Sequence, residues 1–310
     1  MPSILVVGAG ELGTSVLRAL ALSPKRPEAT QFTVLLRPET LASPTLAKKR
    51  NIDEIQFLGV KVQSGDFIAA SVSELVAIFQ PFDIVIQCAG YGMPRGTQVK
   101  VTQAALQAKV PRFFPWQFGL DFDQIPETSY GGMFDDNKLV RKLLRGQNDI
   151  DWTVVSTGLF MSYLFLPSFG VVDAKKRVVR ALGSWENKTT ITLPEDIGKM
   201  VAEVVYAPSK EGSDHMVYLS GDTITYSRLA DLVEEHFKAE FTGELWTIPK
   251  LEDDLEKDPG NLWKKYRVVF ATGHGVFWGK EESFNVKRQI PLTSVPDYLE
   301  RNGKVIKDLD

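Results

Sequence analysis

Short apolar runs alternate with amphipathic stretches through the first half of the chain. Apolar runs without polar interruption indicate strands buried on both faces, whereas apolar residues spaced three or four apart indicate helices. The expected strands cover residues 4–7, 32–36, 60–62, 82–90, 110–114 and 152–156, and the expected helices cover 15–22, 72–79, 97–108 and 133–145. This alternation predicts an α/β fold with a Rossmann-type, doubly wound parallel sheet.

The second half of the chain has a less regular pattern. Strands are expected at 189–193 and 216–219, and helices at 194–206 and 225–237. We expect residues 1–156 to form one domain, with 189–237 folding back onto it. Residues 157–188 and 238–310 are expected to form a smaller, interleaved C-terminal region.

A glycine-rich turn, Gly8-Ala9-Gly10-Glu11-Leu12-Gly13, follows the first expected strand directly. In a strand–turn–helix unit, Gly8 permits the tight turn, Gly10 the approach of a pyrophosphate, and Gly13 the close packing of helix on strand. The N-terminus of the following helix offers N–H groups and the positive end of its dipole to phosphates. The turn therefore predicts a dinucleotide site.

The end of the second expected strand indicates which dinucleotide is bound. An NAD site usually has an acidic residue there, which binds the ribose 2′-hydroxyl. This chain has Arg37 instead, and Lys48, Lys49 and Arg50 follow and can add positive charge. Arginine suits a 2′-phosphate, so the sequence favours NADPH/NADP+ over NAD. Glu39, two residues beyond, is a competing acid that favours the opposite choice.

The composition excludes several other classes of protein. The chain has 310 residues, enough for a sizeable core, and a net charge of -3, which gives no reason to expect nucleic acid or a membrane as partner. It has one cysteine, Cys88, and three scattered histidines, so neither a disulfide nor a metal site is expected. Without a signal peptide or a membrane-spanning run, we expect a soluble, cytoplasmic protein that is a monomer or a homodimer.

Lys138, on the expected helix 133–145, is the candidate for proton transfer. The pattern places Leu139, Val140, Leu143 and Leu144 on an apolar stripe, and Lys138, Arg141, Lys142 and Arg145 on the polar side. Lys138 then either belongs to a solvated basic face or has a pKa lowered enough to exchange protons. No Tyr-x-x-x-Lys pair stands at the expected place, and no G-x-S-x-G turn occurs, which argues against two familiar active sites.

Several segments together resemble the NmrA-like, isoflavone reductase-like family of atypical short-chain dehydrogenases/reductases, and in particular its fungal aromatic alcohol reductase-like branch. These segments are 8–13, Arg37, Gly65-Asp66, Arg112-Phe113-Phe114-Pro115-Trp116-Gln117-Phe118-Gly119 and Lys138, and later 156–160, 169–173, 181–185 and 194–198. The resemblance covers residues 4 to about 235. Its most specific motif is the Arg-Phe-Phe-Pro segment.

The resemblance implies roles for individual residues. Lys138 matches the family's catalytic lysine, Arg37 the arginine that binds the 2′-phosphate, and Phe118 the aromatic residue beside the nicotinamide. Asp66 stands where members of the family contact adenine with a Gly-Asp turn. The cofactor-binding residues expected in this way are Gly8, Gly10, Leu12, Gly13, Arg37, Asp66, Phe67, Ala89, Gly90, Pro115 and Phe118.

The implied function is NADPH-dependent reduction of a small aromatic or polyketide-like substrate at a carbonyl, enone or quinone-methide-like group, with Lys138 in proton transfer. The smaller region would bind substrate or act as a lid, and the expected apolar wall comprises Tyr91, Met93, Phe118, Phe160, Phe165 and Phe169. Plant members have Ser-Glu in place of Trp116-Gln117, so plant substrates do not carry over, and some fungal relatives lack the lysine. The alternative is a non-catalytic, NADP(H)-sensing regulatory protein of the NmrA type.

Overall fold

A computed structural model describes residues 2–90, 92–126, 132–207 and 215–308. The chain forms two compact units. The first comprises Met1–Phe118, Phe134–Val155 and Ile197–Val217, and the second comprises Gly119–Met133, Ser156–Asp196 and Tyr218–Asp310. Of the range 189–237, which was expected to fold back onto the first domain, residues 197–217 belong to the first unit and the remainder to the second.

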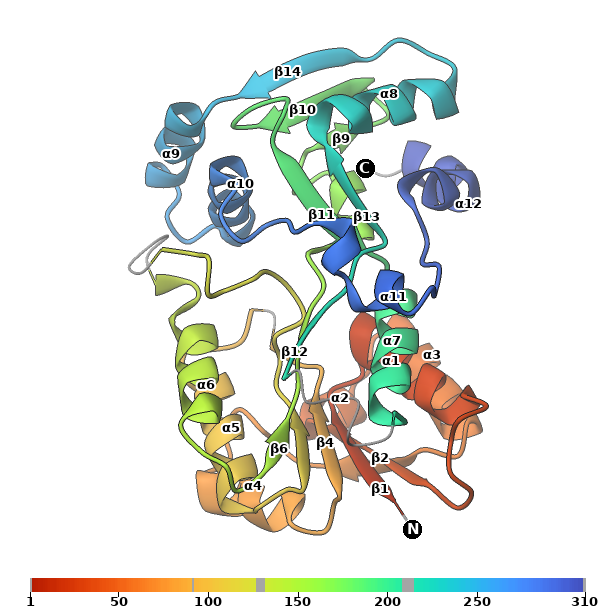
Figure 1. Cartoon of the computed structure of the whole chain (residues 1–310), viewed down its shortest axis with the longest axis vertical. Coiled ribbons are helices and arrows are strands. Elements are labelled where there is room, and N and C mark those ends of the chain that lie inside the picture. The colour runs from red at the N-terminus through yellow and green to blue at the C-terminus, as the bar shows by residue number, and fades with distance from the viewer. Residues whose placement is uncertain (1, 91, 127–131, 208–214, 309–310) are drawn as a thin grey trace. The chain divides into compact units, whose positions relative to one another are not determined.

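The first unit is built on a six-stranded parallel sheet in the order β3-β2-β1-β4-β5-β6 (Figure 1). Its strands are β1 (Ser3–Val7), β2 (Gln31–Leu36), β3 (Lys61–Ser64), β4 (Ile84–Gln87), β5 (Arg112–Phe114) and β6 (Asp151–Trp152). The strand order reverses between β1 and β4, and ligands of such sheets bind beside this reversal, at the carboxyl ends of the strands. The predicted Rossmann-type fold is confirmed.

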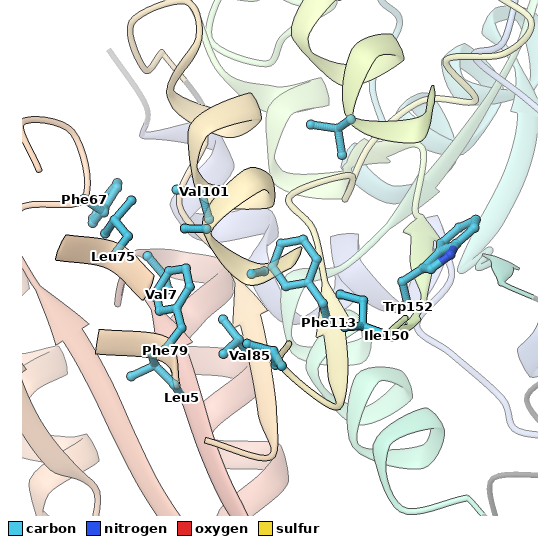
Figure 2. Packing of buried hydrophobic residues seen from close by; sticks show 14 of the residues in the cluster. Leu5, Val7, Phe67, Leu75, Phe79, Val85, Val101, Phe113, Ile150 and Trp152 are labelled. Carbon is cyan, nitrogen blue, oxygen red and sulfur yellow. The ribbon is translucent and has the colours of Figure 1, made fainter. Parts of the chain in front are cut away.

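Helices connect these strands and cover the sheet. They are α1 (Glu11–Leu22), α2 (Pro38–Ala42), α3 (Leu46–Phe57), α4 (Val72–Phe79), α5 (Thr97–Gln107), α6 (Asp135–Arg145) and α7 (Pro194–Val205). Successive side chains of a strand point to opposite faces, so Leu5 and Val7 share one face of β1. On that face they pack with Val85, Leu75 of α4 and Val101 of α5 in one buried cluster (Figure 2).

Arg112, the first residue of the Arg-Phe-Phe-Pro motif, binds the end of a helix in the first unit. Its guanidinium donates hydrogen bonds of 3.1 Å to the carbonyl oxygens of Val204 and Val205, at the end of α7, and lies 3.6 Å from an Asp151 carboxylate oxygen. A cation at a helix C-terminus satisfies carbonyls that have no partner within the helix. Burial lowers the pKa of Arg112. The arginine of this motif therefore fastens α7 to β5.

The second unit consists of small sheets and helices. Its strands are β8 (Leu159–Phe160), β9 (Val172–Asp173), β10 (Val178–Leu182), β11 (Lys188–Thr192), β13 (Asp222–Thr225) and β14 (Thr242–Trp246), in the orders β14-β10-β9 and β13-β11-β8. Its helices are α8 (Tyr226–Phe237), α9 (Ile248–Glu256), α10 (Leu262–Thr272), α11 (Phe284–Lys287) and α12 (Val295–Lys307), with short 3-10 turns at Met161–Phe165 and Lys280–Glu282. Phe169, fully buried, packs against Trp263 and Phe270 at centroid distances of 5.8 and 5.9 Å.

The expected strand at 152–156 is wrong in one respect, because it is two strands. Asp151–Trp152 pairs with β5, whereas Val154–Ser156 forms β7 and pairs with β12 (Met216–Tyr218). At the change of partner, the N–H of Thr153 bonds to Phe113 and that of Val154 to His215. The sequence does not show this change of pairing partner, because both strands are buried and the apolar run continues through them.

Among the residues that the structure describes, no helix is both long and apolar enough to span a membrane.

Candidate functional site

The glycine turn after β1 is held so tightly that two of its glycines cannot carry a side chain. Gly8 has φ +92°, its N–H donates to the Leu35 carbonyl oxygen at 3.0 Å, and an added Cβ would lie 2.7 Å from the Ala89 Cβ. A Cβ on Gly13 would lie 2.0 Å from the Gly8 carbonyl oxygen. The turn is therefore fixed by its own backbone and by its contacts with Leu35 and Ala89, at the reversal between β1 and β4.

Gly10 differs from its two neighbours in the motif because the space beside it is open. No atom lies within 4 Å of a Cβ built on Gly10, which is the N-cap of α1 and makes no side-chain cap bond. Glu11, at the start of the helix, is exposed, while Leu12 is buried. An accessible backbone at a helix N-terminus fits an anion such as a pyrophosphate. The packing around Gly10 therefore does not require a glycine, and its role in pyrophosphate binding stays a prediction.

Arg37 lies at the carboxyl end of β2 and is the N-cap of α2. Its guanidinium forms an ion pair with Glu39, and the exposed fractions of the two side chains are 29% and 64%. The more exposed Glu39 carboxylate is thus paired with the Arg37 guanidinium, and a phosphate that bound this guanidinium would compete with the carboxylate. The three other basic residues expected near this site lie on the exposed surface of α3: Lys48, Lys49 and Arg50.

Asp66 and Phe67 follow β3 and have well-defined structural contacts. Oδ1 of Asp66 accepts hydrogen bonds from the N–H groups of Ile68 and Ala69, at 2.9 and 3.0 Å. Phe67 is buried in the cluster under α4 and α5. The carboxylate therefore holds a turn, and a role for Asp66 in adenine binding stays a prediction.

The segment after β4 meets the segment after β5. A Cβ on Gly90 would lie 2.2 Å from the indole ring of Trp116, so the ring lies directly on the Gly90 backbone. The fully buried Gln87, the last residue of β4, donates to the Ala89 carbonyl oxygen at 3.1 Å, and within the described part of the chain its Oε1 has no partner. Burial raises the pKa of the Cys88 thiol and so disfavours the thiolate, which is the nucleophilic form.

Lys138 lies in the first half of α6 and is half-buried. The start of this helix is fastened to the loop after β4. Asp135 accepts from the Arg95 guanidinium at 2.7 Å, and Asp136 accepts from the Gly96 N–H at 2.6 Å. These bonds bring the lysine's helix to the edge of the sheet where the glycine turn also lies.

The structure corrects the predicted faces of this helix. Arg141, expected on a solvated basic face, is only 1% exposed, whereas Leu139, expected on the apolar stripe, is 43% exposed. The buried positions are Asn137, Val140, Arg141 and Leu144. These positions have helical spacing, but a pattern that counts only apolar residues as buried does not find them.

A polar network that sequence reasoning missed joins α6 to the segment after β5. The fully buried Gln117 accepts a hydrogen bond from the Arg141 Nε at 3.0 Å, and its Nε2 donates to the Asn137 carbonyl oxygen at 3.2 Å. Pro115 and Phe118, both expected at the cofactor, are buried on either side of this contact. The structure thus brings Phe118 and Lys138 into adjoining segments of one unit.

The expected substrate wall is divided between the units. Met93 packs at the edge of the buried cluster of the first unit. Phe160, Phe165 and Phe169 belong to the second unit, in which Phe165 and Phe169 are buried and Phe160 is half-buried. Tyr91 lies outside the described residues. For these aromatics a role in substrate binding stays a prediction. In the described ranges, no group of three or more His, Cys, Asp or Glu side chains could hold a metal ion.

Comparison with known proteins covers nearly the whole chain. The NmrA-like family matches residues 2–259. An NmrA-like family domain-containing oxidoreductase of Gibberella moniliformis is 45% identical over 96% of this chain and 97% of its own length. Phenylcoumaran benzylic ether reductase Pyrc5 of Pyrus communis is 27% identical over 96% of each protein. The structure of the leucoanthocyanidin reductase–NADPH complex from Vitis vinifera matches with a TM-score of 0.77 at 19% identity, over 98% of this chain and 99% of that one.

Proposed function

Because the chain belongs to the NmrA-like family, as its sequence motifs predicted, we propose that it is an NADPH-dependent reductase of a small aromatic or polyketide-like molecule. The observation that carries this proposal is the placement of the glycine turn and Lys138 in one unit. The loop after β4 links them, since Ala89 lies against Gly8 and Gly96 is bonded to α6. The oxidoreductase at 45% identity supports the reaction class.

Different residues of the first unit would bind different parts of the cofactor. The open backbone at Gly10 and the N-terminus of α1 would hold the pyrophosphate, and Arg37 would hold the 2′-phosphate. The buried acceptor on Gln87 suits a donor at the end of β4. When bound, NADPH would supply a hydride to the substrate. The NADPH complex of the grapevine reductase, which has the same fold, supports this choice of cofactor.

Lys138 would be the catalytic residue that moves the proton. Its ammonium is a hydrogen-bond donor and a proton source, and either property stabilises negative charge that develops on a carbonyl or phenolic oxygen during reduction. Phe118, in the adjoining buried segment, would form the wall beside the nicotinamide. The reducible group would be a carbonyl, an enone or a quinone-methide-like carbon. The name of the pear relative, a benzylic ether reductase, supports an aromatic substrate.

Oxidation of NADPH by a panel of aromatic substrates tests this function. We expect the absorbance of NADPH to fall in the presence of the purified protein and at least one class of aromatic ketone, chalcone or naphthoquinone. Tight binding of NADPH, measured by fluorescence, without turnover on any member of the panel would instead support an NADP(H)-sensing regulatory protein.

Replacing Arg37 by aspartate is expected to weaken NADPH binding by about 100-fold, because a charge-assisted phosphate partner becomes a repulsive acid. NADH binding should change little. Dissociation constants for both nucleotides, measured by fluorescence titration, check this expectation.

Glu39→Gln provides the matched control. It removes the carboxylate that pairs with Arg37 and leaves the guanidinium in place, so NADPH should bind equally well or more tightly. If Arg37→Asp weakened both nucleotides equally, Arg37 would not be the residue that discriminates between them.

A further inference from the structure

A buried pair, Arg141 and Gln117, joins α6 to the segment that follows β5. Arg141 is 1% exposed and Gln117 is 0% exposed, and the Arg141 Nε donates to the Gln117 Oε1 at 3.0 Å. We propose that Arg141 and Gln117 are positioning residues that fix the Lys138 side chain relative to residues 116–118. This inference rests on the proposed function, because it requires Lys138 to take part in proton transfer.

Gln117 acts directly on the peptide group that carries Lys138. Its Nε2 donates to the carbonyl oxygen of Asn137 at 3.2 Å, and that carbonyl belongs to the peptide bond between Asn137 and Lys138. In the opposite direction, the Asn137 Nδ2 reaches the Trp116 carbonyl oxygen at 3.5 Å. The two segments are thus joined by contacts in both directions, next to the backbone of Lys138.

The pair adds a directional contact to α6 on the C-terminal side of Lys138. Asp135 and Asp136 hold the first turn of the helix, before Lys138. Arg141 is three residues after Lys138, and residues at this spacing are neighbours on a helix surface. A contact on each side of Lys138 opposes rotation of the helix about its axis. That rotation is the motion that would turn the lysine away from the edge of the sheet.

The partner segment, residues 116–118, is itself packed against other parts of the first unit. The Trp116 ring lies on the Gly90 backbone at the carboxyl end of β4. Gln117 is followed by Phe118, which is 3% exposed. One short segment therefore connects the Gly90 backbone, the predicted nicotinamide wall and the backbone of Lys138. A small displacement here would change the distance between the lysine and the reacting atoms, and rates are sensitive to such displacements.

A buried guanidinium is not the simplest way to stabilise this contact. Removing a charge from water is costly, and a well-packed apolar pair of similar volume is often as stable as a buried polar one. A hydrogen-bonded pair has directions that an apolar contact lacks. Stability and orientation can therefore be separated experimentally by exchanging both residues together.

The test compares the double variant Arg141→Met, Gln117→Met with the single variant Gln117→Glu. The double variant keeps the volume approximately and removes both members of the Arg141–Gln117 hydrogen bond together. Gln117→Glu keeps an acceptor for Arg141, removes the donor to Asn137 and adds a carboxylate charge beside the guanidinium, so it covers the case in which the double variant does not fold. Lys142→Met, which removes an exposed charge from the same helix, is the control.

The first measurement needs no substrate. Trace acetylation with acetic anhydride, with and without NADP+, is followed by mass spectrometry of the peptide that contains Lys138. We expect the double variant and Gln117→Glu to retain folding and NADP+ binding, while the labelling rate of Lys138 relative to Lys100 changes several-fold. Lys142→Met should leave that ratio unchanged. A folded variant with unaltered Lys138 labelling, in both the double and the single substitution, would overturn the proposal.

The second measurement is turnover on a substrate found in the panel. We expect kcat to fall by about 100-fold in the double variant, with the KM for NADPH unchanged. In a Lys138→Ala background the same exchange should cause no further loss, because the pair acts through the lysine. Additive losses would overturn the proposal while leaving the role of Lys138 intact. A normal kcat for Lys138→Ala alone would instead reject the role of the lysine and, with it, the positioning role.

Discussion

Replacing Lys138 by alanine is expected to lower kcat by about 100- to 10,000-fold while the protein still folds and binds NADPH, because proton transfer by a positioned side chain contributes this much to a rate. The half-buried lysine is on α6, whose first turn is fastened to the loop after β4. Its ammonium is not part of the glycine turn, so the affinity for NADPH should change little. Single-turnover oxidation of NADPH and a fluorescence titration measure the two quantities separately.

Lys142→Ala is the matched control for this experiment. Lys142 is exposed on the same helix, one turn after Lys138, and its removal changes the net charge equally. We expect near-normal kcat for this variant. Unchanged turnover in Lys138→Ala, on a substrate that the unmodified protein reduces, would exclude the lysine from the chemistry and leave binding and orientation as the sources of catalysis.

Replacing Gly13 by alanine is expected to reduce the free energy of unfolding by about 3 kcal/mol, near the upper end of the usual cost of overpacking. Alanine in a helix is normally favoured over glycine by about 1 kcal/mol. Here the new Cβ would lie 2.0 Å from the Gly8 carbonyl oxygen, and Gly8 is held at φ +92° by its bond to Leu35. The clash exceeds the gain in helix propensity, so the turn must distort.

Gly10→Ala separates packing from ligand binding. A Cβ at this position meets no atom within 4 Å, and Gly10 has a negative φ, so the Tm should fall much less than in Gly13→Ala, by no more than the poorer N-cap preference of alanine costs. If the pyrophosphate lies against this backbone, the methyl group should still weaken NADPH binding by about tenfold or more. Thermal unfolding and nucleotide titration of both variants provide the comparison. Normal NADPH affinity in a folded Gly10→Ala variant would place the phosphates elsewhere.

The sequence predicted those parts of the fold that depend on local pattern. The helices at 72–79 and 97–107 and the capping of α8 by Thr225 have their causes within a few residues, namely apolar spacing and one side-chain oxygen. Helix α3 was not predicted, because it is mostly polar and has a single buried residue, Ile55. The two strands within 152–156 were not distinguished, because a change of pairing partner leaves the apolar run unbroken.

For the candidate site, too, some residues could be predicted from the sequence and others could not. The glycine motif, Arg37 and Lys138 could be predicted from the sequence, because each is identified by its position relative to the neighbouring strand or helix. The burial of Arg141 is not, because an arginine in an amphipathic pattern ordinarily lies in water. Only the packing of α6 against the segment after β5 gives it Gln117 as a partner.

The sequence by itself determined a parallel sheet, the position of the glycine-rich turn and the family, because short-range periodicity and close-set motifs encode them. Tertiary structure alone decided what excludes a side chain at Gly8, because the atom that a Cβ would meet there belongs to Ala89, which is remote in the chain. It likewise decided which face of α6 is buried, and so where Lys138 lies. Contacts between distant segments are made only when the sheet is assembled, and no local pattern specifies them.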